Sequence, residues 1–204
     1  MLIDLKNIGE NSNHKREIIT KYNSTSYFYD NRYREIQESK YQIILYEYDL
    51  NGKLTLDLGC GTGLLIEYLT KFKNKNKNSL IFYVGLDFSL KMLLEFKSKI
   101  NKLTYRNNLS LVLSDIENLP FRGNKFNTIF SITSFQNLDN INKAIIESCR
   151  VSKHNTDFNF SILKKKLNLE ILLEFLSPFS EIKQTLSIHD LEDVVIQGKF
   201  LKVS

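Results

Sequence analysis

Three of the eight glycines in this chain of 204 residues fall within five positions, at Gly59, Gly61 and Gly63. Glycines at alternate positions let the backbone turn sharply and approach a ligand without Cβ atoms in the way. A tight turn between a strand and a helix would need only one of them. The cluster therefore predicts a loop that holds a ligand.

The surroundings of this loop indicate which part of a ligand it contacts. Residues 54–58 have the apolar pattern of a buried strand, and a helical pattern begins at Leu64. The free N–H groups at a helix N-terminus attract anionic groups, carboxylate as well as phosphate. The loop is therefore expected to face an anionic part of the ligand.

Two acidic residues follow the next two apolar runs. Asp87 comes directly after residues 81–86, and Asp115 comes shortly after residues 109–113. An acid at the first position typically accepts hydrogen bonds from ribose hydroxyls, although it also suits the dipole of a helix N-terminus. Asp115 beside Ile116 suits an adenine, because the carboxylate accepts from the exocyclic amine and the apolar side chain covers the ring. Alternatively, Asp115 is a solvated loop acid.

The order of the elements explains how these residues can meet. Strand and helix patterns alternate from residue 53 onward, which predicts a doubly wound α/β domain with a mostly parallel sheet and ligands at the carboxyl ends of its strands. The turn His189–Glu192 is too short for a parallel crossover, so the last strand is expected to be antiparallel. The expected strands are 54–58, 81–86, 109–113, 126–132, 158–163, 181–188 and 193–200. One expected helix begins at Leu64, and three further helices are expected over residues 89–100, 138–151 and 167–176.

The N-terminal part is more polar and less regular. Residues 1–27 are predicted to be a separate, partly flexible segment. A helical pattern over residues 30–45, with Asp30 or Asn31 as its cap, predicts that residues 28–204 form one domain with an N-terminal helix.

The motifs resemble those of the class I S-adenosylmethionine-dependent methyltransferases. Residues 56–63, LDLGCGTG, match the first motif of that family almost letter for letter. Residues 85–89, 114–121 and 126–131 resemble its second, third and fourth motifs. The resemblance covers about residues 28–204. It implies S-adenosylmethionine as cofactor and a seven-stranded sheet of order 3-2-1-4-5-7-6.

The resemblance also implies roles for single residues. Asp57 and the glycine loop would hold the methionine part of the cofactor, Asp87 the ribose, and Asp115 with Ile116 the adenine. The cofactor-binding candidates are Asp57, Gly59, Cys60, Gly61, Gly63, Asp87, Phe88, Asp115, Ile116 and Ser131. Residues 131–137 replace the Asn-Pro-Pro-Tyr type of motif, which disfavours the branches that methylate exocyclic amines and glutamine amides.

A sulfonium cofactor carries a methyl group that is already activated, so the enzyme mainly aligns the nucleophile. A base is needed only where the nucleophile must lose a proton. The candidates for catalysis are Gln136, Asn137 and Tyr29. Tyr29 could form a lid together with Tyr22 and Tyr33. Alternatively, these tyrosines simply pack the N-terminal helix onto the sheet. The histidines and the two cysteines are scattered, so no metal site is expected.

The composition bounds the location and the partners. The net charge of +5 and the pI of about 9.0 permit an RNA partner, which Lys164–Lys166 could attract. Alternatively, the positive charge reflects a general composition bias, because the chain has a single alanine and many Lys, Asn and Ile residues. A second basic stretch, residues 71–77, is expected to lie away from the site. Two distant cysteines, no signal peptide and no long apolar run predict a cytoplasmic protein without a membrane segment.

Strand 109–113 is expected at a sheet edge with no Lys or Pro to protect it. It could accept a strand from a small zinc-binding activator subunit, since residues 131–137 resemble the same loop in methyltransferases that use such a subunit on tRNA, rRNA or translation factors.

The methyl acceptor stays open between a small molecule and a tRNA or translation component. A non-catalytic binding subunit remains an alternative, and a nucleotide-dependent oxidoreductase is disfavoured because the glycines are not spaced G-x-G-x-x-G.

Overall fold

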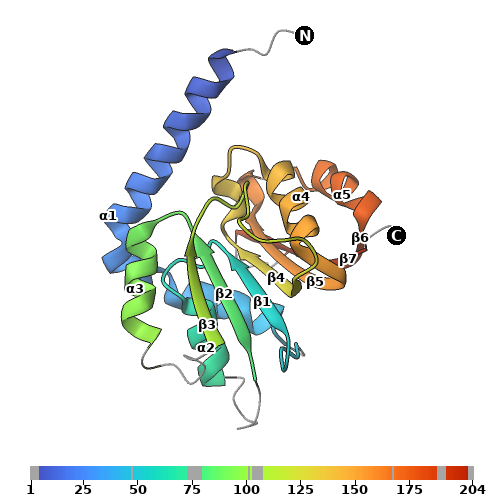
Figure 1. Cartoon of the computed structure of the whole chain (residues 1–204), viewed down its shortest axis with the longest axis horizontal. Coiled ribbons are helices and arrows are strands. Elements are labelled where there is room, and N and C mark those ends of the chain that lie inside the picture. Colours follow the sequence, from blue (N-terminus) through green and yellow to red (C-terminus); the bar gives the residue numbers. More distant parts are fainter. Residues whose placement is uncertain are drawn as a thin grey trace.

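A computed structural model of the chain describes residues 5–46, 48–72, 80–100, 102, 108–166, 168–187 and 192–201. It contains one seven-stranded sheet of order β3-β2-β1-β4-β5-β7-β6 (Figure 1). The strands are β1 (Leu54–Leu58), β2 (Phe82–Asp87), β3 (Leu109–Leu113), β4 (Phe126–Ile132), β5 (Ser152–Leu163), β6 (Ser180–Ser187) and β7 (Asp193–Phe200). Strand β7 is antiparallel to both neighbours. The predicted fold class, strand order and antiparallel strand are confirmed.

The helices cover the two faces of the sheet separately. They are α1 (Leu5–Ile44), α2 (Leu64–Phe72), α3 (Leu90–Ile100), α4 (Ile141–Val151) and α5 (Leu169–Leu176), with short 3-10 turns at 135–137, 164–166 and 177–179. Ile129 of β4 packs in one buried cluster, with α4 and α5, while its neighbour Phe130 packs in another, with α1, α2 and α3. Successive strand residues point to opposite faces, so the sheet separates two cores.

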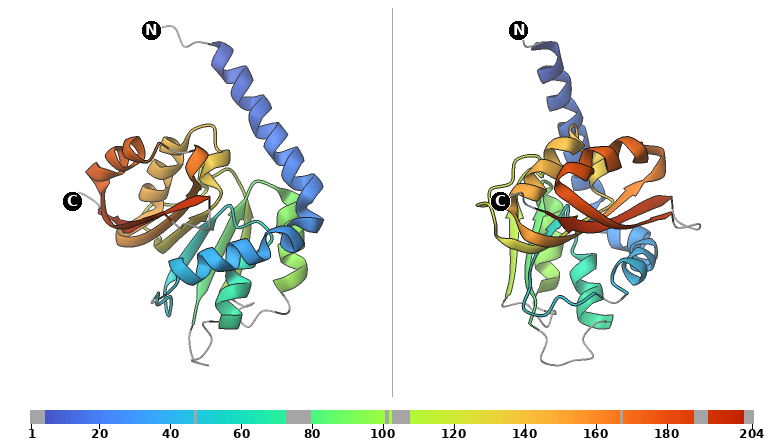
Figure 2. Two further views of the ribbon diagram at one scale, coloured as in Figure 1. Left: turned by 180° about the vertical axis from the view of Figure 1, so that it is seen from behind. Right: turned by 90° about the vertical axis from the view of Figure 1, so that its right-hand side faces the viewer.

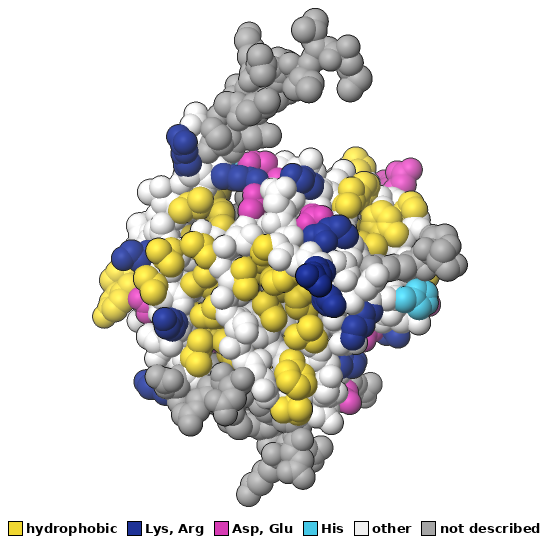
Figure 3. Space-filling model, in the orientation of Figure 1, with side chains coloured by type: hydrophobic (Ala, Val, Ile, Leu, Met, Phe, Trp, Pro, Cys, Tyr) yellow, Lys and Arg dark blue, Asp and Glu magenta, His cyan; other side chains and the backbone are white. Residues whose placement is uncertain are grey.

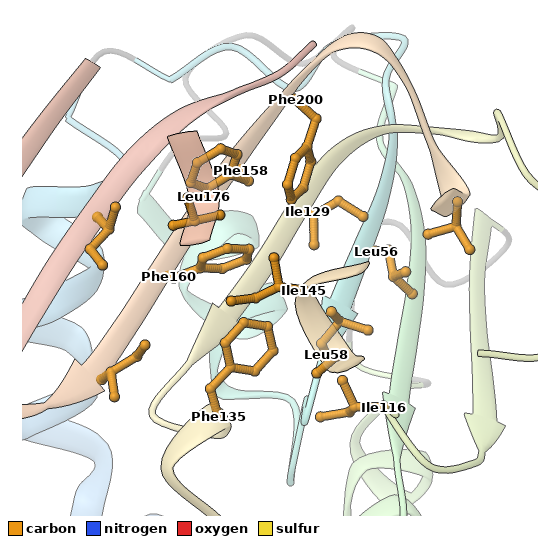
Figure 4. Close-up of a cluster of buried hydrophobic side chains, with 14 of the residues drawn as sticks. Leu56, Leu58, Ile116, Ile129, Phe135, Ile145, Phe158, Phe160, Leu176 and Phe200 are labelled. Carbon is orange, nitrogen blue, oxygen red and sulfur yellow. The ribbon is translucent and has the colours of Figure 1, made fainter. Parts of the chain in front are cut away.

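The core under α4 and α5 is rich in phenylalanine. Phe158 and Phe160 of β5 stack with ring centroids 4.7 Å apart, and Phe135 lies 4.7 Å from Phe160 (Figure 4). Leu58 and Ile116 belong to the same cluster. The residues that end β1 and follow β3 are thus fixed by the same core.

The N-terminal helix differs from its prediction. Helix α1 begins at Leu5 and runs through Asp30, so the expected start and cap at Asp30 or Asn31 were wrong. The two halves of α1 run in different directions, the second lying along the sheet beside α2 (Figure 2). The helix also crosses the boundary predicted at residues 27 and 28. The flexibility of residues 1–27 stays a prediction.

Asp30 shows why the helix does not begin there. Its carboxylate accepts from Lys99 Nζ at 2.6 Å, from Arg34 at 3.1 Å and from the Thr62 hydroxyl. Lys99 and Arg34 also reach Glu67 of α2, at 2.7 and 2.9 Å. The side chain that was expected to cap the helix instead ties α1 to α2 and α3.

Smaller differences concern element ends. Helix α4 begins at Ile141, capped by Asn140, and not at Leu138. Strand β5 is longer than expected and begins at Ser152. The expected turn at His189 and most of the basic stretch 71–77 lie outside the described residues.

Candidate functional site

The glycine loop joins β1 to α2 at the carboxyl edge of the sheet. Gly59, Gly61 and Gly63 all have positive φ, at 75°, 54° and 83°. A Cβ on Gly63 would lie 2.5 Å from the Phe96 ring, and one on Gly59 would collide with the Ser134 side chain. The loop therefore needs glycine for its backbone conformation and, at two positions, for lack of space.

Asp87 holds this loop from the end of β2. One carboxylate oxygen accepts from the Gly61 N–H at 2.9 Å, and the other accepts from the Ser89 N–H at 2.8 Å. Burial raises the pKa of Asp87 to about 6, and the backbone hydrogen bonds oppose this rise. The carboxylate thus links the glycine loop to the start of α3.

Asp57 lies deeper, within β1. It is buried, and the Tyr83 hydroxyl donates a hydrogen bond to it. Burial raises the pKa of Asp57 to about 7, although the hydrogen bond from Tyr83 lowers it. A nearby cation would favour the charged form of this carboxyl.

Two adjoining pockets open on the glycine loop. The outer pocket has about 630 Å³ of empty space, including its mouth, and is lined among others by Gly59, Gly61, Asp87, Phe88, Asp115, Ile116, Tyr29 and Asn137. The inner pocket, with about 320 Å³, is lined among others by Asp57, Cys60, Thr62, Gln37 and Tyr41. Both share Gly59, Gly61, Tyr29 and Ile132. These four residues mark the junction between the pockets.

The inner pocket contains an unsatisfied acceptor. Gln37 of α1 is only 5% exposed, and its Oε1 has no hydrogen-bond partner among the described residues. A buried amide oxygen without a donor costs free energy, on the order of 1–3 kcal/mol. Together with Asp57, it makes the inner pocket suited to a ligand group that donates hydrogen bonds and carries positive charge.

The first half of α1 lies over the outer pocket. Lys15 Nζ contacts Asp115 at 2.8 Å and Glu117 at 3.0 Å. Further along the helix, the Tyr22 hydroxyl accepts from Asn137 Nδ2 at 2.9 Å. Helix α1 is therefore a wall of the pocket as well as a cover for the sheet.

The structure brings most of the predicted site residues together. Three do not line either pocket: Gly63 packs on Phe96, Ser131 is fully buried, and Gln136 donates to the Thr133 carbonyl at 2.6 Å. The roles assigned to the individual residues stay predictions. The described residues contain no group of three or more His, Cys, Asp or Glu arranged to hold a metal ion.

Sequence reasoning missed Lys15 and Gln37. Both come from α1 and reach the site across long separations in sequence. No pattern in the sequence of α1 indicates a function for either residue, because lysine and glutamine are ordinary residues on the surface of a helix.

Comparisons with known proteins decide the family. Residues 56–159 match the family described as "Methyltransferase domain". The chain belongs to the class I S-adenosylmethionine-dependent methyltransferases. An uncharacterized protein from Methanocaldococcus jannaschii is 31% identical over 134 residues, 66% of this chain and 45% of that protein. A malonyl-[acyl-carrier protein] O-methyltransferase from Hamiltonella defensa is 27% identical over 158 residues, 78% of this chain and 56% of that enzyme.

Solved structures show the same fold. A SAM-dependent methyltransferase from Aquifex aeolicus has a TM-score of 0.71 at 20% identity, covering 88% of this chain and 98% of that one. A methyltransferase from Haloferax volcanii, solved with the Trm112 activator, has a TM-score of 0.67 at 15% identity, covering 89% and 98%. The chain spans about half the length of the curated relatives it matches. No helix among its described residues is both long and apolar enough to cross a membrane.

The residues present fit the cofactor of this family. S-adenosylmethionine has an adenosine half, a methionine half with an ammonium group, and a sulfonium between them. The ammonium would supply the missing donor for Gln37 Oε1 and the missing cation for Asp57. Asp87 and Asp115 lie in the outer pocket, where an adenosine would find acceptors.

Replacing Gly63 by alanine is expected to destabilise the fold by about 2–5 kcal/mol. The left-handed backbone costs about 1–2 kcal/mol for a residue with a Cβ, and the clash with Phe96 adds about 1–3 kcal/mol. Gly61→Ala is the matched control, because it has positive φ with nothing within 4 Å of the new Cβ, and should lose only about 1 kcal/mol. Urea unfolding measures both. Equal losses would contradict the packing argument.

Asp57→Asn is expected to flatten the pH dependence of stability. The pKa of Asp57 is raised from 3.8 to about 7, so the folded protein keeps a proton that the unfolded chain releases. The contribution of Asp57 to the free energy of unfolding is therefore fully present below about pH 4. It is lost as the pH rises to 7, by up to about 4 kcal/mol. Unfolding free energies of both proteins between pH 4 and 8 test this. Parallel curves would refute the raised pKa.

Proposed function

We propose that this chain binds S-adenosylmethionine across the two pockets and transfers its methyl group to an acceptor. The observation that carries the proposal is the division of acceptor groups between the pockets. Asp87 and Asp115 belong to the outer one, and Asp57 with Gln37 to the inner one. The acceptor oxygens that line each pocket match the donors of one half of the cofactor.

The outer pocket is proposed to hold the adenosine. Each oxygen of Asp87 already accepts one backbone hydrogen bond, but a carboxylate has about four acceptor positions and can also take the ribose hydroxyls. Asp115 would accept from the adenine amine while keeping its ion pair with Lys15. Ile116 and Phe88, which line the same pocket, would cover the adenine and the ribose.

The junction of the pockets is the proposed place of the sulfonium. When bound, the cofactor supplies an activated methyl group at this point. Tyr29 and Ile132 face the junction from α1 and from the end of β4. Burial raises the pKa of Tyr29, so its hydroxyl stays protonated and does not act as a base at neutral pH. Its contribution is orientation and exclusion of water.

We infer a small-molecule acceptor over an RNA. Lys164–Lys166, the stretch expected to steer an RNA, forms a 3-10 turn whose residues do not line either pocket. Lys165 is also paired with Glu192, at 3.1 Å. One of the relatives is a malonyl-[acyl-carrier protein] O-methyltransferase, which is named for a small acyl group held by a carrier protein and not for a nucleic acid. The free end of a malonyl group is a carboxylate, and a carboxylate needs no base at neutral pH. A cytoplasmic location is part of the proposal, supported by two free cysteines.

Calorimetry with S-adenosylmethionine and S-adenosylhomocysteine tests cofactor binding, and radiolabelled methyl transfer into fractionated small molecules, RNA and protein tests turnover. We expect binding of both ligands and no label in RNA, with the label either in the small-molecule fraction or on an acyl group held by a carrier protein. Failure to bind either ligand would overturn the proposal. Binding without any transfer would identify a non-catalytic subunit.

The edge of the sheet is a proposed site for a partner. Strand β3 has one neighbour, β2, and Leu113 at its end is 55% exposed. Figure 3 shows hydrophobic side chains on the side of the molecule where β3 and α3 lie, and Leu90 and Leu94 of α3 are exposed there as well. An unpaired strand edge can take up a strand from another protein. We propose a small zinc-binding activator subunit as that partner, by analogy with the Haloferax complex.

A monodisperse and fully active chain expressed alone would count against the partner. If the partner exists, Leu113→Lys should abolish its binding, because a charged side chain at an edge opposes strand addition. Ile146→Lys on α4 is the matched control, since Ile146 is 53% exposed and lies away from β3. Size-exclusion chromatography of the co-expressed proteins measures both variants.

Asp87→Ala is expected to lower the affinity for S-adenosylmethionine about 100-fold. Hydrogen bonds to a charged group contribute about 1.5–3 kcal/mol each, and the glycine loop loses its tie as well. Calorimetry measures the affinity, and circular dichroism confirms that the variant is folded. Glu192→Ala, at an exposed position, is the control and should bind as the wild type does. An unchanged affinity in Asp87→Ala would refute its role.

A further inference from the structure

Thr133 has an unusual backbone. It is the first residue after β4, it lines the outer pocket, and its φ is 59°. A branched residue with positive φ is a genuine outlier, and such a conformation costs about 1–3 kcal/mol. The surrounding structure must therefore hold Thr133 in place.

Four hydrogen bonds use every polar group of Thr133. Its N–H donates to the Ser161 carbonyl at 2.8 Å, and its carbonyl accepts from Gln136 Nε2 at 2.6 Å. Its hydroxyl accepts from Lys40 Nζ at 2.7 Å and donates to Asp193 at 3.2 Å. The backbone and the side chain are thus fixed from β5, from the loop itself, from α1 and from β7.

Lys40 and Asp193 form a buried ion pair behind this residue. Lys40 is 2% exposed, Asp193 is 1% exposed, and Nζ lies 2.9 Å from the carboxylate. Burial lowers the pKa of Lys40, and Asp193 opposes this change. A buried pair contributes little to stability compared with apolar residues of similar size. Its presence at this position points to a role other than stability.

We propose that Lys40 and Asp193 are positioning residues for methyl transfer, which act through Thr133 to fix the loop of residues 133–137 against the acceptor. The inference rests on the proposed function. Residues 132–134, 137 and 138 line the outer pocket beside the junction where the sulfonium would lie. The loop is therefore the wall that an acceptor must meet. A misplacement of about 1 Å in such a wall can cost about 100-fold in rate.

Thr133→Val is the gentlest test, because it keeps the branched shape and leaves the ion pair intact while removing the hydroxyl. We expect kcat for the acceptor found by radiolabelling to fall about 100-fold, with the Kd for S-adenosylmethionine changed less than about 3-fold. Thr133→Ser keeps the hydroxyl and should restore kcat to within about 3-fold of the wild type. Loss of cofactor affinity in parallel with kcat would overturn the proposal, since it would indicate general damage to the pocket.

The double variant Lys40→Met/Asp193→Leu removes the pair without leaving a lone buried charge. The matched control is Lys165→Met/Glu192→Leu, which removes an exposed ion pair. In the wild type, Lys165 Nζ lies 3.1 Å from the Glu192 carboxylate. Hydrogen exchange at the Thr133 amide should become about 10-fold faster in the buried double variant and stay unchanged in the control. A folded variant with wild-type exchange and wild-type kcat would refute the proposal.

The readouts separate this inference from the proposed function. If the wild type neither binds S-adenosylmethionine nor transfers methyl groups, the proposed function fails. Exchange at the Thr133 amide then still decides whether the ion pair holds the loop. If the double variant does not fold, Thr133→Val and Thr133→Ser decide the proposal by kcat and by exchange alone.

Discussion

The carboxylate of Asp87 accepts hydrogen bonds from the backbone of two different elements, the glycine loop and the start of α3. Its burial is costly for a charged group, and the rise of its pKa to about 6 measures that cost. The hydrogen bond from Gly61 to Asp87 helps to fix the backbone of the glycine loop, in which three residues have positive φ. Both pockets are built on Gly59 and Gly61, and the carboxylate of Asp87 fixes Gly61 while the Leu86 carbonyl fixes Gly59.

Helix α1 supplies the other wall through a different kind of interaction. Its charged side chains reach several elements: Lys15 reaches Asp115, Asp30 reaches Lys99, and Lys40 reaches Asp193. The first two pairs are partly exposed and the third is buried. Each contributes little to stability, but together they fix where the helix lies. The sheet thus provides the acids of the site, while α1 closes the pockets and adds Gln37 and Tyr29.

This division explains what the sequence could predict. Strands such as 109–113 and 126–132 are local patterns, and their positions were predicted correctly. The acids Asp87 and Asp115 lie at the ends of neighbouring strands and come together because the sheet is parallel. The full length of α1 was not, because its first half has no regular apolar stripe and is placed by ion pairs with distant residues. Gln37 and Lys40 become functional candidates only once the helix lies on the sheet, which no spacing within α1 encodes.

The loop after β4 shows how this chain departs from family members with an Asn-Pro-Pro-Tyr motif. Its polar side chains are engaged in holding the loop: Ser134 donates to the Leu58 carbonyl, Gln136 to that of Thr133, and Asn137 to Tyr22. Such side chains have limited freedom to exchange a proton with an acceptor. A cofactor whose methyl group is already activated requires mainly alignment. The loop, held by hydrogen bonds to the strained Thr133 and by the buried ion pair behind it, is suited to the alignment that the proposed chemistry requires.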